Sequence, residues 1–273
     1  VTPALSLLLN GAANNLTVTY SAQTNATASE SNSGDADVVY DLYRNDAGIS
    51  NPDVQTFAAS TYTYIYNTSG GANYTSATIS RTLTVNKAAT DVKLFLNGIE
   101  SNSSQTYGTN SNATATLNVS GRTFQLYRNG TQVASGTSSI SEVLTLAAGY
   151  YNYTVAYAGN ENYTGDSQAY FLTISRATSV LSLLLDGVDS DTSVAANTNV
   201  TINASSITPA GATVSLYEDD SFVSSSAAPS AIRNYTTLGD RVWKVNLSES
   251  ENYTGGEKTH TISVSDPESP QYS

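Results

Sequence analysis

Hydrophobic and polar residues alternate along much of this chain. In the stretch YYNYTVAY at 150–157, Tyr153 and Val155 alternate with Asn152 and Thr154. The same alternation recurs at 64–66, 83–85, 172–174, 243–245 and 262–264. A period of two is typical of a β-strand with one buried face, and no stretch has the 3.6-residue period of an amphipathic helix. The pattern predicts an all-β protein.

The alternating stretches belong to a unit that occurs three times. The phrase ENYTG stands at 161–165 and 251–255, with the related ANYTS at 72–76, so that its Asn residues lie 89 and 90 residues apart. Two further landmarks recur in the same order: LLN, FLN and LLD before a Gly, and DLYRN, QLYRN and SLYED at 41–45, 125–129 and 215–219. Three landmarks at one spacing indicate three tandem repeats.

A unit of about ninety residues has the size of a self-sufficient sandwich, because solenoid repeats span roughly 20–50 residues. We therefore predict three tandem immunoglobulin-like β-sandwich domains, each of about seven short antiparallel strands. The predicted domains are 1–88, 89–177 and 178–265, followed by a polar tail at 266–273. The joints at 85–90 and 174–179 contain no Gly, so we expect a stiff linear array.

One run of residues resembles a known family. The pattern YNYTVAYAGNENYTG followed by FLTISRAT is similar to the Ig-like repeats of large bacterial and archaeal surface proteins, and all three units share it. The resemblance covers nearly the whole chain. It implies an extracellular structural or adhesive module and no enzymatic activity.

Composition narrows the function further. Charged residues make up 12% of the chain, against roughly 25% in an ordinary soluble domain, and the net charge is −12. This acidic balance disfavours nucleic acid and anionic lipid as partners. Cys and Met are both absent, which excludes disulfides and thiolate metal sites and suits an extracellular location. No apolar run is long enough for a membrane span. Because the chain starts at Val1, we expect that it follows a processing cut or is an excerpt of a longer protein.

Sequons for N-glycosylation are unusually frequent. About seven Asn-x-Ser/Thr triplets would occur by chance in this composition, and the sequence has fifteen. They are Asn15, Asn25, Asn67, Asn73, Asn102, Asn112, Asn118, Asn129, Asn152, Asn162, Asn199, Asn203, Asn234, Asn246 and Asn252. Several alternate with inward apolar residues, so we expect covalent N-glycans on outer faces. The alternative is an Asn- and Thr-rich composition in which the repeated turn needs Asn for its backbone.

Candidate chemistry beyond the sequons is sparse. The lone His260 stands where the other repeats have Arg81 and Tyr170, which indicates an ordinary strand residue. A nucleophilic triad could be built only around it, so we predict no catalytic residue, no enzyme and no cofactor. Asp186, Asp189 and Asp191 are a weak candidate for Ca²⁺, since carboxylates at short spacing suit that ion. A solvated hairpin turn is the simpler interpretation, and no metal site is predicted.

The leading prediction is a structural subunit of an extracellular assembly: a glycosylated filament, pilus-like fibre or surface stalk. We expect the chain to be its own partner, associating head to tail, and the open sheet edges allow a terminal segment to donate a β-strand. The sequon density favours an archaeal source. The first alternative is an adhesin that binds host or cell-wall glycans through end loops, for which Tyr62, Tyr107, Tyr150 and Tyr235 are candidate exposed rings. The second is a passive spacer in a larger surface protein.

Overall fold

The computed structural model describes residues 1–31 and 36–266. These residues divide into two compact units, each discontinuous in sequence. The first unit comprises Val1–Leu94, Thr114–Ser141 and Tyr153–Ala169, and the second comprises Phe95–Ala113, Glu142–Asn152 and Tyr170–Ser273. The predicted tail lies outside the described residues from position 267 onward, and the three predicted domain boundaries stay a prediction.

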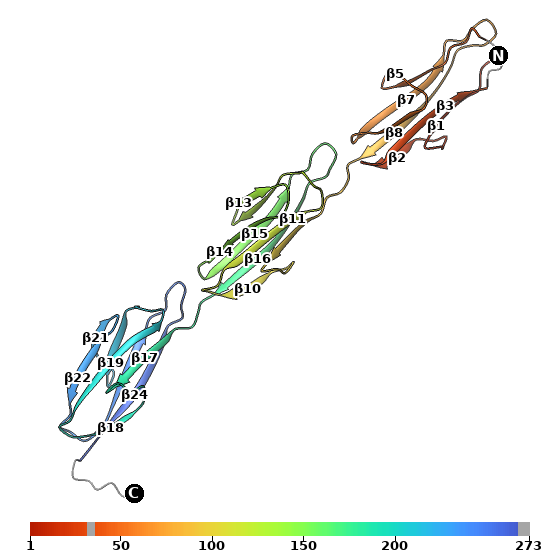
Figure 1. Ribbon diagram of the computed structural model, residues 1–273. Helices are drawn as coiled ribbons and strands as arrows, with labels where there is room; N and C mark the ends of the chain where they lie inside the picture. Colours follow the sequence, from red (N-terminus) through yellow and green to blue (C-terminus); the bar gives the residue numbers. More distant parts are fainter. Residues whose placement is uncertain (32–35, 267–273) are drawn as a thin grey trace. The chain divides into compact units, whose positions relative to one another are not determined.

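All regular structure in the described residues is β-strand (Figure 1). The first eight strands are β1 (Leu5–Leu9), β2 (Leu16–Thr19), β3 (Gln23–Glu30), β4 (Asp41–Arg44), β5 (Ala47–Ile49), β6 (Asp53–Thr56), β7 (Ser60–Thr68) and β8 (Ala77–Asn86). The next eight are β9 (Val92–Leu96), β10 (Ser103–Thr106), β11 (Ser111–Leu117), β12 (Phe124–Arg128), β13 (Thr131–Gly136), β14 (Ile140–Leu144), β15 (Gly149–Tyr157) and β16 (Asp166–Ser175). The last eight are β17 (Val180–Leu185), β18 (Thr192–Ala195), β19 (Asn199–Thr208), β20 (Val214–Glu218), β21 (Ser221–Ser226), β22 (Ser230–Asn234), β23 (Gly239–Leu247) and β24 (Gly256–Ser265).

The strands form six sheets, and each repeat supplies one sheet of three strands and one of five. The three-stranded sheets have the orders β1-β3-β6, β14-β11-β9 and β17-β19-β22. The five-stranded sheets have the orders β2-β8-β7-β4-β5, β10-β16-β15-β12-β13 and β18-β24-β23-β20-β21. In each repeat the first, third and sixth strands form the small sheet, and the eighth strand lies beside the seventh in the large sheet. This division of strands between two sheets is that of an immunoglobulin-like sandwich. The predicted all-β, tandem immunoglobulin-like fold class is confirmed.

The prediction of purely antiparallel strands was wrong at one place in each repeat. The initial strand is divided in two: its first part pairs with the small sheet, and its second part (β2, β10 or β18) pairs in parallel with the last strand of the repeat. Leu16 is the partner of Leu83, Ser103 of Leu172, and Thr192 of Ile262. A turn carrying a Gly with positive φ separates the two parts, which lets the chain change sheets. Each repeat therefore has eight strands instead of seven.

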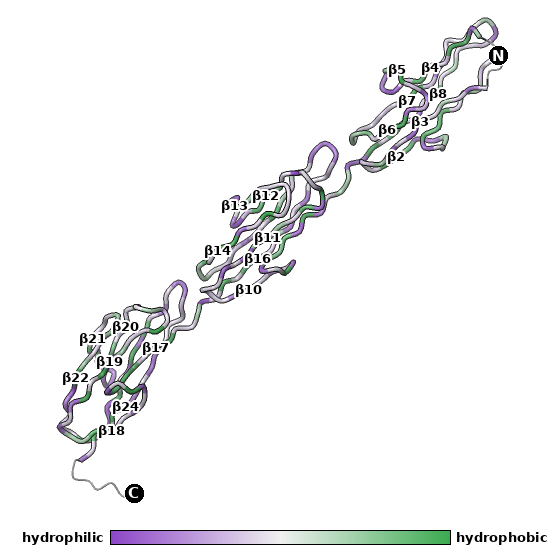
Figure 2. The backbone as a smooth tube through the Cα atoms, in the orientation of Figure 1, coloured by the Kyte–Doolittle hydropathy of each residue, from purple (hydrophilic) through white to green (hydrophobic). Residues whose placement is uncertain are grey.

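The buried cores follow the alternation seen in the sequence (Figure 2). Tyr64, Tyr153 and Trp243 occupy one inward position of the three repeats and are all essentially inaccessible to solvent. Other inward residues predicted from the period are also buried: Tyr66, Leu83, Val85, Val155, Leu172, Ile174, Val200, Ile202, Val245, Ile262 and Val264. At roughly 1.5–3 kcal/mol for each large apolar side chain, this burial is the main driving force for folding.

The core of the first repeat contains an ion pair. Arg44 on β4 contacts Asp53 on β6, and the Tyr64 hydroxyl donates a hydrogen bond of 2.7 Å to the same Asp53 carboxylate. Gln55 Nε2 donates to its other oxygen at 2.7 Å. Burial opposes ionisation of Asp53, but these donors outweigh it and hold the pKa of the carboxyl below its usual 3.8. We call Arg44, Asp53 and Tyr64 the first hub.

The third repeat has a related network with the charges exchanged between strands. Glu218 on β20 accepts hydrogen bonds of 2.7 Å from Arg233 Nε on β22 and from the Tyr235 hydroxyl. That hydroxyl in turn accepts a bond of 2.9 Å from Trp243 Nε1. Tyr235 had been a candidate exposed ring, but it is only 8% exposed because this network draws it inward. We call Glu218, Arg233, Tyr235 and Trp243 the second hub.

Candidate functional site: the NYT loops

The recurring phrase forms the loop between the last two strands of each repeat. We call the segments 73–75, 162–164 and 252–254 the NYT loops. Each loop is closed by a tight turn, in which the Tyr carbonyl accepts a bond of 2.9–3.0 Å from the amide three residues earlier. Gly70 and Gly159 precede two of these turns with positive φ, and a Cβ at Gly159 would lie 2.6 Å from the nitrogen of Gly165. The phrase therefore marks a turn before the last strand of each repeat.

The second NYT loop holds the segment that follows the first repeat. The Ala88 amide donates to the Asn162 carbonyl at 2.9 Å, and the Thr164 amide donates to the Ala88 carbonyl at 2.9 Å. This is a short parallel bridge, and all three residues lie within the first compact unit. Because both main-chain groups of Ala88 are used, the loop fixes the local path of the linker.

The third NYT loop repeats these bonds inside the second compact unit. The Ala177 amide donates to the Asn252 carbonyl at 2.9 Å, and the Thr254 amide donates to the Ala177 carbonyl at 2.9 Å. The first NYT loop holds Val1 similarly: the Val1 amino group donates to the Asn73 carbonyl, and the Thr75 amide donates to the Val1 carbonyl, both at 3.0 Å. One local structure therefore occurs three times.

The Asn side chains of two NYT loops also bind the repeat that comes before them in sequence. Asn162 Oδ1 accepts a hydrogen bond of 2.9 Å from the Ala59 amide, and Asn252 Oδ1 accepts one of 2.9 Å from the Ala148 amide. Ala59 and Ala148 occupy equivalent positions: each directly precedes its strand, β7 or β15. These amides stand at the end of a strand pair, where the sheet ladder offers them no carbonyl, so the Asn oxygen satisfies them.

Aromatic rings and basic side chains also make equivalent contacts at the second and third NYT loops. Tyr163 packs edge-on against Tyr20 with ring centroids 5.3 Å apart, and Tyr253 packs edge-on against Tyr107 at 5.5 Å. Such pairs contribute roughly 0.5–1.5 kcal/mol beyond the area they bury. The residue before each linker Ala is basic: Lys87 Nζ donates to the Asn160 carbonyl at 2.7 Å. Arg176 is its counterpart before Ala177.

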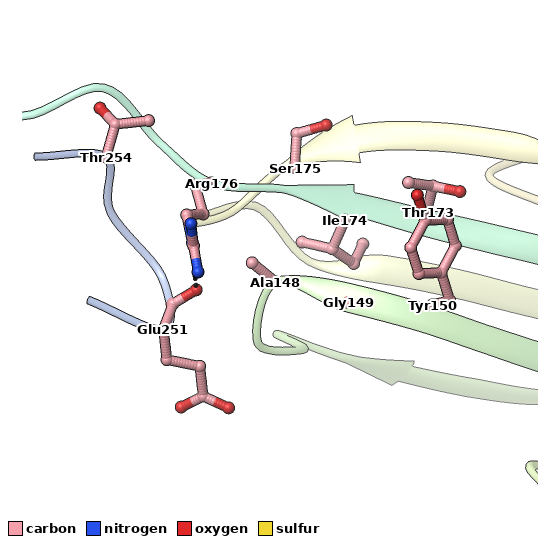
Figure 3. Close-up of a pocket in the computed structure, with 9 residues that line it drawn as sticks. All are labelled: Ala148, Gly149, Tyr150, Thr173, Ile174, Ser175, Arg176, Glu251 and Thr254. Atoms are coloured by element: carbon pink, nitrogen blue, oxygen red, sulfur yellow. Dashed lines mark hydrogen bonds between the residues drawn. The ribbon is translucent and has the colours of Figure 1, made fainter. Parts of the chain in front are cut away.

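A shallow groove of about 620 Å³ lies beside the third NYT loop (Figure 3). Arg176 crosses it and donates from Nε to the Glu251 carbonyl at 3.3 Å, while its Nη1 pairs with Glu249 at 3.0 Å. Tyr150, which is 79% exposed, lies on the far side, and Thr254 borders the loop side. The two bonds of Arg176 join the linker to the residues just before the NYT loop across this groove.

The three candidate calcium ligands do not converge on one point. Asp186 Oδ1 accepts a hydrogen bond of 2.7 Å from the Thr201 amide. In the other repeats Asn10 and Asn97 accept the equivalent bonds, from the amides of Asn25 and Asn112. Asp189 and Asp191 instead contact His260. Asp189 Oδ1 lies 2.8 Å from its Nε2, and Asp191 Oδ1 lies 3.3 Å from its Nδ1. Within residues 1–31 and 36–266, no group of three or more His, Asp or Glu residues is placed to hold a metal ion.

His260 holds a loop against a strand. Lys258 Nζ also binds Asp189, at 2.6 Å, and the Thr261 amide donates to Asp191 Oδ1 at 2.9 Å. The bond from Lys258, followed by that from His260, lowers the pKa of Asp189. The Thr261 amide and then His260 lower the pKa of Asp191. In the other repeats neutral Asn15 and Asn102 accept the equivalent strand amide, so the contact is structural.

The predicted sequons fall into two groups by exposure. The exposed asparagines are Asn15, Asn25, Asn73, Asn102, Asn112, Asn118, Asn129, Asn152, Asn199, Asn203 and Asn234. The partly buried ones are Asn67, Asn162, Asn246 and Asn252. Sequence reasoning offered two interpretations, sugar attachment and a turn that needs Asn, and did not detect the joint. The available signal was the recurrence of Ala-Ala-Ser or Ala-Ala-Gly at 58–60 and 147–149 in step with the NYT loops.

The chain is similar to solved structures of tandem domains but matches no family model. No family model matches the chain, and no curated protein matches it. Among solved structures, an I-band fragment of titin is 12% identical with a TM-score of 0.40, covering 97% of this chain and 99% of that one. Fibronectin(III)-like modules of Clostridium thermocellum CbhA are 13% identical with a TM-score of 0.27, covering 66% and 98%. SGBP-B of a Bacteroides ovatus mixed-linkage glucan utilization locus, solved in complex with a mixed-linkage heptasaccharide, is 12% identical with a TM-score of 0.25, covering 97% of this chain and 71% of that one.

These likenesses concern fold at most. The chain's own contacts carry the argument about function. Among the described residues, none forms a helix long and apolar enough to cross a membrane.

Proposed function

We propose that this chain is a structural element of an extracellular assembly, in which consecutive immunoglobulin-like sandwiches provide length and the NYT loops hold the joints. The observation that supports this most directly is the repeated joint. Two NYT loops bind the linker backbone, accept a hydrogen bond from an amide of the preceding repeat and pack a Tyr ring edge-on against a Tyr of that repeat. The NYT phrase is the most regular feature of the sequence, and it is used to fix the linkers. This supports a function that depends on how the repeats are connected.

The head-to-tail filament is a narrower version of this proposal. It would need the end of the third repeat to offer what the first two repeats offer to an NYT loop. At the equivalent positions the third repeat has Ala196 in place of Tyr20 and Tyr107, Leu238 in place of Ala59 and Ala148, and Asp266 in place of the basic residue. We therefore propose that self-association, if the assembly is a filament, uses a sheet edge instead of another NYT joint.

Immunogold electron microscopy of the source organism tests the proposal. Antibodies against the described residues should label structures outside the cell envelope, and deletion of the coding sequence should shorten or remove those structures. Restoring the gene with Asn162→Ala and Asn252→Ala should leave labelled but disordered structures. A matched restoration with Asn129→Ala, a hairpin residue outside the joints, should recover normal ones. Label confined to the cell interior would contradict the proposal.

A further inference from the structure

The fifteen sequons are not equivalent in the folded chain. We propose that N-linked sugar is carried on the outer face of the three-stranded sheets, at Asn25, Asn112 and Asn203, and is excluded from Asn162 and Asn252 in the NYT loops. This assignment rests on the extracellular location in the proposed function and adds to it which side chains are modified.

The three acceptor positions share one local design. Each lies on the middle strand of a three-stranded sheet, β3, β11 or β19, in the sequence Asn-Ala-Thr or Asn-Ala-Ser. The central alanines Ala26, Ala113 and Ala204 are at most 3% exposed. Because successive side chains of a strand point to opposite faces, the Asn and the hydroxyl residue of each sequon lie together on the outer face. A sugar there adds bulk away from the core.

Apolar side chains are exposed on the same face. Val54, which is 46% exposed, is the direct partner of Asn25 in the β3–β6 ladder. Ile232, which is 67% exposed, is the partner of Thr201, two residues from Asn203 on the same face of β19. Directly opposed residues share one face of a sheet. A sugar attached beside these side chains would cover apolar surface that otherwise contacts water.

The two excluded asparagines are committed to the joints. Their side chains are partly buried, and each Oδ1 accepts a main-chain amide at 2.9 Å, which fixes the orientation of the whole amide group. Nδ2 is bonded to the same carbon as Oδ1, so a sugar on it would enter the space where the loop meets Ala88 or Ala177. Attachment there would displace the linker or the Tyr ring.

The chemistry is a glycosyl transfer from an activated donor, a sugar linked to a lipid pyrophosphate. Nδ2 of the asparagine forms a bond to C1 of the sugar, the bond from C1 to the pyrophosphate oxygen breaks, and the pyrophosphate leaves with the bonding electrons. One amide proton passes to a base of the transferase. No oxidant or reductant is required, and the product is the N-linked glycan of an Asn-x-Ser/Thr triplet.

Glycopeptide mass spectrometry of the full chain, purified from its source organism, tests the assignment. Electron-transfer fragmentation is needed because Asn129, Asn152 and Asn162 fall on one tryptic peptide. We expect a sugar mass on Asn25, Asn112 and Asn203 and none on Asn162 or Asn252. A sugar on either joint residue, or an unmodified outer face, would overturn the proposal. The chain is taken from the extracellular fraction, because a chain inside the cell would not meet the transferase. An exported chain with sugar on the wrong sequons overturns only this assignment, whereas a chain found only inside the cell overturns the proposed function.

Two variants separate modification from folding. Asn203→Gln should remove one sugar mass and leave amide hydrogen exchange at 147–149 unchanged. Asn252→Gln should leave the total sugar mass unchanged and raise exchange of the Ala148 amide at least tenfold, since its acceptor moves. If Asn252→Gln lowered the sugar mass instead, Asn252 would be an acceptor and the exclusion would be wrong.

Discussion

The first and second hubs occupy corresponding places in two repeats but have opposite polarity. In the first hub the strand of the large sheet carries the cation Arg44, and the small sheet carries the acid Asp53. In the second hub the large sheet carries the acid Glu218, and the small sheet carries the cation Arg233. Both include a phenol that donates to the carboxylate at 2.7 Å.

The difference shows which property of the hub is required by the fold. The position needs a pair of opposite charges and a ring hydroxyl, because an unpaired charge at a partly buried site would be costly. It does not need a particular residue on a particular strand. This explains why the landmark DLYRN can become SLYED in the third repeat without loss of the fold. The second hub also differs in exposure: the Arg233 side chain is 36% exposed and Arg44 only 22%.

Removing the acid from each hub should have unequal effects. Asp53→Ala leaves Arg44 and the Tyr64 hydroxyl without their acceptor, so we expect a loss of about 3 kcal/mol from the unfolding free energy of the first repeat. Glu218→Ala should cost about 1 kcal/mol, since Arg233 can reach water.

Trp243 is the only tryptophan, so its fluorescence reports the third repeat. Denaturant curves followed by Trp243 should shift for Glu218→Ala and stay unchanged for Asp53→Ala, whose effect should appear in hydrogen exchange at β3. Equal costs would mean that the hubs are energetically equivalent.

The ring donors offer a second comparison. Trp243→Phe removes the bond from Nε1 to Tyr235 and leaves unfilled volume at a fully buried site, for which we expect a loss of about 2 kcal/mol. Tyr64→Phe removes only the hydroxyl donor to Asp53 and should cost about 1 kcal/mol. Scanning calorimetry of the two variants measures both. A larger cost for Tyr64→Phe would show that the hydroxyl bond outweighs packing.

Alkaline pH should affect both hubs by a smaller amount. Burial, followed by the bond to Asp53, raises the pKa of Tyr64 above its ordinary value of 10, and burial followed by the bond to Glu218 does the same for Tyr235. The folded state therefore favours the neutral phenols. Their contribution is fully present below pH 10 and is lost as the pH rises above 10.

Absorbance at 295 nm checks this alkaline effect. Tyr64 and Tyr235 should ionise only together with unfolding, and Tyr64→Phe should remove one of these two delayed ionisations. Tyr150→Phe, at a side chain that is 79% exposed, is the control and should leave the unfolding pH unchanged. A smooth titration of all phenols below the unfolding pH would contradict the prediction.

Much of the fold could be predicted because it depends on a period of two. The inward positions Tyr153, Val155 and Leu172 were identified from alternation alone, and the cores contain them. The split first strand was not predicted, because β2 and β10 are short and polar: LTVT and SSQT carry little hydrophobic signal. Pairing with the last strand depends on backbone groups, which the sequence does not distinguish.

The joints and hubs were missed for a related reason. Asn162 reads as a sequon and a turn residue, and its third role depends on an amide 103 positions away. Tyr235 was a candidate exposed ring, but Glu218 and Trp243 hold its hydroxyl inside. Long-range hydrogen bonds between residues of ordinary local propensity leave no periodic trace.

The parallel pairing of the first and last parts of each repeat has a mechanical consequence. Tension applied to the two ends of a repeat would pull β2 and β8 in opposite directions along their common axis, and likewise β18 and β24. The ladder bonds from Leu16–Thr19 to Leu83–Asn86 would then bear the load simultaneously instead of opening one after another. A repeat closed in this way resists stretching until several bonds fail together, so it would extend in abrupt steps rather than gradually.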